Sequence, residues 1–443
     1  MSRQVPARRR PVGFRGTSLE TARAAGPQRA TASLGHPAGP EVHSGPREGP
    51  VFLGFRAAAP DGSEDTASTA SRRVGPAPED PAGPGPSSDS GRERAVALLH
   101  GVAVGDALGS LTEGYWPPEI VAAYGGEISD FPADNGGTPP VRGGTGRPGG
   151  RRARRPRTTD DTAFTLLVGH SITACGRVDE DDIVRRILAR PIPKWPGWEE
   201  FCSSWSRGEF QTRTGTGGAM RIAPVGILHP ISPGPEQGPG GREGPQGPGS
   251  GESPDDLRRL IRDVTLATRA SHNSPSSVAA SAALAAAYSV LVDGGDADRA
   301  LRAAVTAADL AEREWEGPDD LCPSVARRLR WVRANVGRGT SIAGLRGRGI
   351  NPGFRAWEAV PAAFAIFLAH QSAREAILCA TNLGGDADSV ASMAGALAAA
   401  LAPDSLPVEW VERALGRQKV SDLAEALYAL RMGARRIRGT HRA

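Results

Sequence analysis

Residues 94–113 read RAVALLHGVAVGDALGSLTE, and this stretch decides the predicted fold. Its apolar residues have helical spacing. Glycine recurs on it at every fourth position: Gly101, Gly105 and Gly109. Glycines on one helical face mark the close approach of another backbone, so the stretch predicts a helix packed directly against a second one. Asp106 and Glu113 are seven residues apart, and we expect both near one face of this helix.

Helical patterns also dominate the rest of the chain. They predict helices at 160–175, 180–190, 255–271, 275–292, 296–313, 320–336, 356–370, 372–380, 387–401 and 419–437. Turn residues separate several of these segments. No run of alternating β-branched residues predicts a strand. We therefore expect an all-α fold.

Three segments lack this pattern. Residues 1–92 are rich in Gly, Pro, Ser, Ala and Arg, and they carry no sustained hydrophobic period. Such a segment buries too little apolar surface to offset the entropy of ordering it, so we expect disorder. Residues 133–157 and 232–254 have a similar composition and predict exposed insertions. One compact domain over 93–437 remains.

Composition excludes several classes of protein. The net charge of +4 is small for 443 residues, and arginine supplies nearly all the positive charge, so we expect no nucleic-acid partner. No two cysteines have metal-ligand spacing, which disfavours zinc and fits a reducing compartment. The Ala-rich stretches near 276–292 and 388–402 read as buried helices, not membrane spans. No apolar region follows the arginines at 8–10, so we expect no secretory signal and a cytoplasmic location.

Two short motifs place hydroxyls and paired carboxylates where a small-residue helix begins. They are residues 158–162 (TTDDT) and 382–389 (NLGGDADS). Helix capping is the alternative interpretation of each motif, because Asp, Ser and Thr are common N-cap residues. One cap needs one side chain, however, and each motif supplies several. Asp386 and Asp388 point apart in a regular helix, so at least one belongs to the turn at Gly384 and Gly385.

These carboxylates flank very apolar helices, where an unpaired charge is costly to bury. No lysine lies nearby in the sequence to pair with them. Carboxylate and hydroxyl oxygens suit Mg²⁺, with Mn²⁺ as a second possibility, and the absence of nearby His and Cys disfavours zinc. Two cations balance four or five carboxylates better than one.

Three acidic motifs, in this order, resemble those of the ADP-ribosylglycohydrolase family. The first is 105–113 (GDALGSLTE), with Asp106 and Glu113, and the second and third are 158–162 and 382–389. Further likeness lies at 216–224 (TGGAMRIAP), which is similar to the family's Gly-Asn-Gly-x-x-Met-Arg segment. Ser271 and His272 resemble its Ser-His step, and 359–363 (AVPAA) resembles the stretch before the last acidic motif. The resemblance covers roughly 93–415, with gaps at the two predicted insertions.

The resemblance implies an orthogonal helical bundle with two Mg²⁺ ions in a cleft. By position it implies these metal ligands: Thr159, Asp160, Asp161, Asp386, Asp388 and Ser389. Asp388 would bridge both ions, and Asp106 would orient the ligands from behind. Glu113 would lie at the metal edge, in contact with metal or substrate. Glu113, Asp161 or Asp388 would be the general acid or base, and the sequence does not assign which.

Substrate contacts are expected elsewhere in the matching segments. The loop Gly215, Thr216, Gly217 and Gly218 could bring backbone N–H groups to a diphosphate, or it could be a plain tight turn before a helix. Thr216 stands where the family has Asn, which leaves ribose and phosphate contacts open.

Two further side chains are expected to contact substrate. Met220 belongs to the family-like Met-Arg step. His272 could contact substrate, or it could be a helix cap or a core group.

The implied activity is hydrolysis of the N- or O-glycosidic bond of an ADP-ribosyl group, carried by a protein or a small molecule. Two alternatives stay open. One is an ADP-ribose-binding or structural protein, as are the lens crystallins among relatives of the family. The other is a hydrolase of a different nucleotide-sugar. We expect a monomer with no membrane partner.

Overall fold

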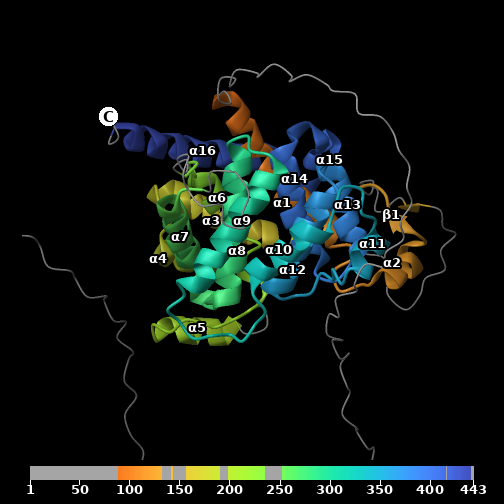
Figure 1. Ribbon diagram of the computed structural model, residues 1–443, viewed down its shortest axis with the longest axis horizontal. Helices are drawn as coiled ribbons and strands as arrows, with labels where there is room; N and C mark the ends of the chain where they lie inside the picture. The colour runs from red at the N-terminus through yellow and green to blue at the C-terminus, as the bar shows by residue number, and fades with distance from the viewer. Residues whose placement is uncertain are drawn as a thin grey trace, which may run out of the picture. The chain divides into compact units, whose positions relative to one another are not determined.

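Two helices far apart in the sequence pack with their backbones in close contact. Helix α1 (Ser88–Gly109) packs antiparallel against α14 (Ala387–Leu401), and Figure 1 shows them side by side. A Cβ atom at Gly101 would lie 2.6 Å from the carbonyl oxygen of Gly395. A Cβ at Gly109 would lie 2.5 Å from Cα of Asp388. The glycine stripe predicted this approach, and the prediction is confirmed.

The computed structural model describes residues 88–131, 141–142, 156–189, 198–234, 252–415 and 417–440. Within these ranges the chain forms sixteen α-helices, two short 3₁₀ turns and one pair of two-residue strands. The all-α prediction is confirmed. Strands β1 (Glu127–Ile128) and β2 (Val141–Arg142) pair antiparallel and were not predicted. They are too short to carry an alternating pattern.

The remaining elements follow in chain order. They are α2 (Pro117–Tyr124), α3 (Asp160–Cys175), α4 (Glu180–Leu188), α5 (Trp198–Ser206), η1 (Thr216–Gly218), α6 (Ala223–Leu228), α7 (Pro254–His272), α8 (Pro275–Val292), α9 (Ala297–Arg313), α10 (Val325–Asn335), α11 (Ile342–Gly347), α12 (Ala356–Ala369), α13 (Ala373–Leu383), η2 (Pro403–Ser405), α15 (Val408–Ala414) and α16 (Arg417–Thr440).

Helix α8 is enclosed by other helices of the fold. It contacts α9, α7, α6, α12 and α14, and Figure 1 shows α9 running beside it. By length and composition α8 could cross a membrane, but 94% of it is buried inside the fold. The enclosing helices explain its hydropathy, as predicted for a buried helix.

Some predicted boundaries are corrected by the structure. Helix α1 begins at Ser88, so residues 88–92 are helical rather than part of the predicted extension. Helix α10 begins at Val325 instead of 320, because Ser324 caps it directly after Pro323. The short helices α2, α5, α6, α11 and α15 were not predicted, since six to nine residues contain too few turns to establish a period.

Much of the predicted low-complexity sequence lies outside the described residues. This holds for 1–87, for 235–251 and for most of 133–157. The edges of the two predicted insertions are described. The backbone N–H of Arg157 donates to Ser110 Oγ at 3.2 Å, and Pro233 bridges Glu252.

The α1–α14 contact predicts opposite effects for the same substitution at two helical glycines. Gly105→Ala would push a Cβ into the backbone of Ala391, which no rotamer change relieves, so we expect a loss of about 1–3 kcal/mol in unfolding free energy. Gly433→Ala is the matched control, because nothing lies within 4 Å of its added Cβ. It should gain roughly 0.5–1 kcal/mol from helix propensity. Urea denaturation measures both, and equal effects would contradict the close packing.

Candidate active site

Asp106, in the last turn of α1, is fully buried and holds the start of α3. Its Oδ2 accepts from the backbone N–H of Thr159 at 2.8 Å, and from the N–H and hydroxyl of Thr162 at 3.0 and 2.5 Å. Its Oδ1 accepts from the Thr159 hydroxyl at 2.8 Å. Burial raises the pKa of Asp106, while these hydrogen bonds lower it. Both oxygens already have partners in the protein, and the supporting role of Asp106 at a metal site stays a prediction.

The second acidic motif begins α3. Thr159 is the N-cap, and its hydroxyl accepts from the N–H of Asp161 at 3.3 Å. The capping interpretation is therefore correct for Thr159, but it leaves the two carboxylates unexplained. Asp160 is exposed toward a pocket, whereas Asp161 is buried and its Oδ1 has no hydrogen-bond partner within the described ranges.

The third motif contains a turn at two positions whose backbone conformation favours glycine. Gly384 and Gly385 have φ of +77° and +70°. Gly385 donates to Tyr115 O at 2.8 Å, and Asp386 N–H donates to Pro352 O at 3.0 Å. A Cβ on either glycine would overlap a backbone carbonyl. The turn is thus clamped from both sides.

The clamped turn orients two carboxylates differently. Asp386 is the N-cap residue of α14 with non-helical φ and ψ, while Asp388 lies in its first turn. This agrees with the prediction that one of the two belongs to the turn. Asp388 Oδ1 accepts from the N–H of Ser389 at 2.9 Å. Asp386 Oδ2 is buried and has no partner among the described residues.

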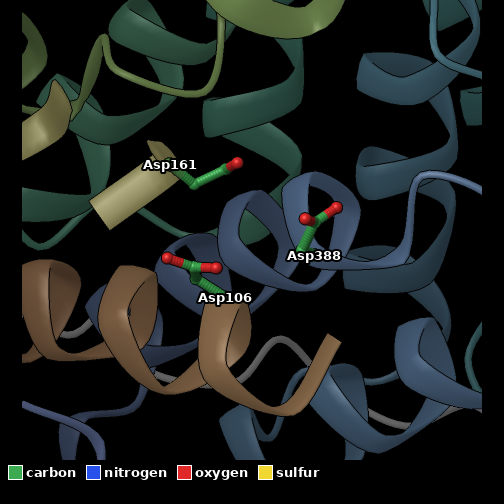
Figure 2. Close-up of side chains that lie close together, drawn as sticks. All are labelled: Asp106, Asp161 and Asp388. Carbon is green, nitrogen blue, oxygen red and sulfur yellow. The ribbon is translucent and has the colours of Figure 1, made fainter. Parts of the chain in front are cut away.

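Carboxylates from α1, α3 and α14 converge on one point. Figure 2 shows Asp106, Asp161 and Asp388 directed toward a common space from three separate helices. One oxygen from each lies within 4.8 Å of the others. The Gly105 and Gly109 contacts bring the first and third helix together, and the Asp106 hydrogen bonds attach the second.

The converging carboxylates raise one another's pKa. Burial and then the charge of Asp388 raise the pKa of Asp161 well above its usual value. Burial, Asp386 and Glu113 do the same for Asp388. Burial raises the pKa of Asp386 to about 7, although hydrogen bonds from Thr216 and Ser389 oppose the shift. The cluster therefore resists full ionisation unless a cation joins it.

The donor set fits a hard divalent cation. All its groups are carboxylate or hydroxyl oxygens, the ligands preferred by Mg²⁺ and Mn²⁺. Two buried oxygens, Asp161 Oδ1 and Asp386 Oδ2, have no hydrogen-bond partner among the described residues, and a buried acceptor left unpaired is costly. Within the described ranges, the charged groups that act most strongly on Asp161, Asp386 and Asp388 are other carboxylates.

The cluster forms one wall of a cavity of about 230 Å³. Its lining includes Glu113, Asp160, Asp161, Phe164, Ile187, Phe201, Arg213, Thr216, Gly217, Met220, Arg221, Ser271, His272, Asp386, Asp388 and Ser389. The cavity is therefore acidic on the side of α3 and α14. Two arginines and a histidine around the turn η1 also line it.

The structure brings most predicted site residues together in this cavity. Thr159 lies behind it, bonded to Asp106. Gly215 and Gly218 flank the lining rather than form it, and Gly218 is buried. Glu113 reaches the cavity, but not from the face of a helix as expected. Helix α1 ends at Gly109, and a turn carries Glu113 past its end.

Several lining residues were not predicted as site residues. Phe164, Ile187 and Phe201 form an apolar part of the wall, and Arg213 adds a cation. They come from α3, α4, α5 and a loop, and no motif in the sequence joins these segments. Arg221 and Ser271 were quoted only as part of the family resemblance, although each directly follows or precedes a predicted contact residue.

Several known proteins are similar to this chain in sequence or in fold. An uncharacterized protein of Archaeoglobus fulgidus is 25% identical over 348 residues, covering 75% of this chain and 95% of that protein. An ADP-ribosylarginine hydrolase Tri1 of Pseudomonas putida is 49% identical over 55 residues, 12% of this chain and 15% of the other. A solved structure described as an ADP-ribosylglycohydrolase-related protein complex superposes with a TM-score of 0.52 at 23% identity, covering 78% of this chain and 100% of that one.

The structural likeness is low in identity and supports the fold alone. A family model described as ADP-ribosylglycohydrolase matches residues 87–436. That range starts one residue before α1 and includes every element that builds the cavity. The chain belongs to the ADP-ribosylglycohydrolase family.

Proposed function

We propose that the chain is a metal-dependent hydrolase that cleaves the N- or O-glycosidic bond of ADP-ribosyl groups. The observation that carries the proposal is a pair of buried oxygens, one on Asp161 and one on Asp386, that have no partner in the part of the chain that the structure describes and belong to a carboxylate cluster that opens into a cavity. A purely structural relative would have no reason to retain such costly groups.

Two Mg²⁺ ions, or Mn²⁺ in their place, fit this cluster. The residues that would hold them are Thr159, Asp160, Asp161, Asp386, Asp388 and Ser389. When bound, the ions would polarise substrate oxygens and lower the pKa of water at the anomeric carbon. Ser389 in place of the family's commoner Thr retains the hydroxyl that this role needs.

The lining around the η1 turn suits the anionic part of such a substrate. Arg213 and Arg221 place positive charge beside the η1 turn. Thr216, Gly217 and Met220 line the same cavity, and His272 packs against Gly217. A diphosphate lying here would have its attached ribose beside the acidic cluster, because both line one cavity and Thr216 hydrogen-bonds Asp386.

The carboxylates of the cavity are the groups available for proton transfer. Glu113, Asp161 and Asp388 are the candidate acid and base groups, since all three carboxyl groups line the cavity beside the proposed metal site. Asp106 would take no part in proton transfer, because its oxygens hold α3.

The direct test is to incubate the protein with ADP-ribosyl-arginine, ADP-ribosyl-serine and O-acetyl-ADP-ribose, with and without Mg²⁺, and to measure released ADP-ribose. The short match to an ADP-ribosylarginine hydrolase makes the arginine linkage the first choice. Mg²⁺-dependent release from one substrate supports the proposal. Binding of ADP-ribose without release from any of them favours the structural relative, and no binding favours another nucleotide-sugar. A monomeric state and a cytoplasmic location stay predictions.

Replacing one cluster carboxylate should separate catalysis from folding. We expect Asp160→Asn, Asp161→Asn and Asp388→Asn each to lower kcat by roughly 10²-fold or more, the scale of losing a positioned charge. The metal-free Asp161→Asn protein should also melt higher than the metal-free wild type, because one repelling buried acid is removed. Circular dichroism and the release assay measure both effects. Asp404→Asn, at an exposed position, is the control. Folded variants with near-normal turnover would contradict the site.

The raised pKa of Asp386 predicts how the metal-free protein responds to pH. Its pKa is about 7 when folded and 3.8 in the unfolded reference, so the folded chain holds the extra proton between these values. The free energy of unfolding contributed by this group therefore falls as the pH rises from about 4 to 7, and the full penalty is present above 7.

In chelator, the melting temperature of the wild type should fall more steeply between about pH 5 and pH 8 than that of Asp386→Asn. Mg²⁺ at a hundredfold excess over its Kd should restore about 2.7 kcal/mol to the wild type at pH 8. Equal slopes for the two proteins, or a melting temperature unmoved by Mg²⁺, would count against the cation site.

A further inference from the structure

Arg221 is a buried cation on the cavity wall with an unusual set of partners. Only 4% of it is exposed, and its Nη2 donates to Ala267 O at 3.2 Å, Thr268 O at 3.4 Å and Ser271 Oγ at 2.9 Å. Burial lowers the pKa of Arg221 to about 10, and Asp160 partly opposes this. The guanidinium therefore stays charged at neutral pH and can only donate.

This fixes the direction of the next hydrogen bond. Ser271 Oγ accepts from Arg221, so the serine proton is left for another acceptor. His272 Nδ1 lies 2.9 Å from Ser271 Oγ, and it is the other partner of this hydroxyl within the described ranges. If Nδ1 carried a proton, Ser271 Oγ would accept twice and its own proton would have no partner, which is costly for a buried hydroxyl.

The second ring nitrogen of His272 faces the η1 turn. A Cβ placed on Gly217 would lie 2.9 Å from Nε2 and 2.6 Å from Cε1 of His272, and one on Gly215 would lie 3.7 Å from Nε2. His272, Gly217 and Ser271 all line the cavity. A proton on Nε2 is thus presented beside the glycine turn, where the proposed function puts an oxygen-rich part of the substrate.

We propose that Arg221 and Ser271 act as positioning residues that hold His272 as a neutral imidazole protonated on Nε2, a fixed hydrogen-bond donor to an anionic oxygen of the substrate. Burial and the charges of Arg221 and Arg213 also lower the pKa of His272 well below its usual value. A neutral imidazole with its proton on Nε2 donates without being an acid of useful strength. Proton transfer is accordingly left to the carboxylates of the acidic cluster.

The tautomer is tested on the ligand-free full chain by ¹⁵N NMR with histidine labelling, and the His272→Gln spectrum identifies the signals of His272. At neutral pH the wild type should show a non-protonated Nδ1 shift and a protonated Nε2 shift for this residue. A protonated Nδ1, or an imidazolium, would overturn the proposal. This readout needs no substrate. If His272 shows this tautomer but the chain releases no ADP-ribose, the positioning of His272 by Arg221 and Ser271 stands and the proposed function is refuted.

The positioning role is tested with a graded pair of variants. Ser271→Ala removes the hydroxyl and should mix the two tautomers of His272, whereas Ser271→Thr keeps the hydroxyl and should restore the wild-type shifts. Once a cleaved substrate is known, Ser271→Ala should raise KM roughly tenfold with a smaller change in kcat, on the scale of one buried hydrogen bond. Ser392→Ala is the control, because this buried hydroxyl lies on α14 and has no partner among the described residues. Wild-type shifts and KM in Ser271→Ala would overturn the positioning role.

Discussion

The contact between the backbones of α1 and α14 is the constraint on which the site depends. Because Gly101, Gly105 and Gly109 have no side chains, the carbonyls of α14 sit where Cβ atoms would otherwise be. This close approach places Asp106 at the end of one helix beside Asp388 at the start of the other. Two buried carboxylates would normally drive such helices apart. The apolar contact along the rest of both helices holds them together, and a cation between the acids would remove the repulsion.

The carboxylates of the cluster have different tasks because their surroundings differ. Asp106 has its oxygens fully used by the threonines at the start of α3, so it fixes the second motif in place. Asp161 and Asp386 each keep a buried oxygen that has no partner in residues 88–131, 141–142, 156–189, 198–234, 252–415 and 417–440, and both have raised pKa values. The first pattern is typical of a residue that holds another segment in place. The second is typical of a binding site for a group that is not part of the chain.

Sequence patterns predicted the parts of this structure that are encoded locally. The bounds of α3, α8 and α14 were correct to the residue, because capping residues and long apolar periods mark their ends. Glu113 was placed on a helix that ends four residues before it, since periodicity alone does not show where the turn at Gly109 begins. The apolar wall from Phe164 and Phe201, and the cation Arg213, could not be predicted because they meet only through tertiary packing.

The central claim is that the buried acids exist to hold divalent cations. A crystal grown with Mn²⁺ tests it most directly, because anomalous scattering locates the metal without reference to activity. We expect two strong anomalous peaks between the start of α3 and the start of α14, within ligand distance of Asp161 and Asp388. Asp161 Oδ1 and Asp386 Oδ2 should point toward these peaks. A map without a peak in the cluster, with protonated carboxyls bonded to each other or to water, would contradict it.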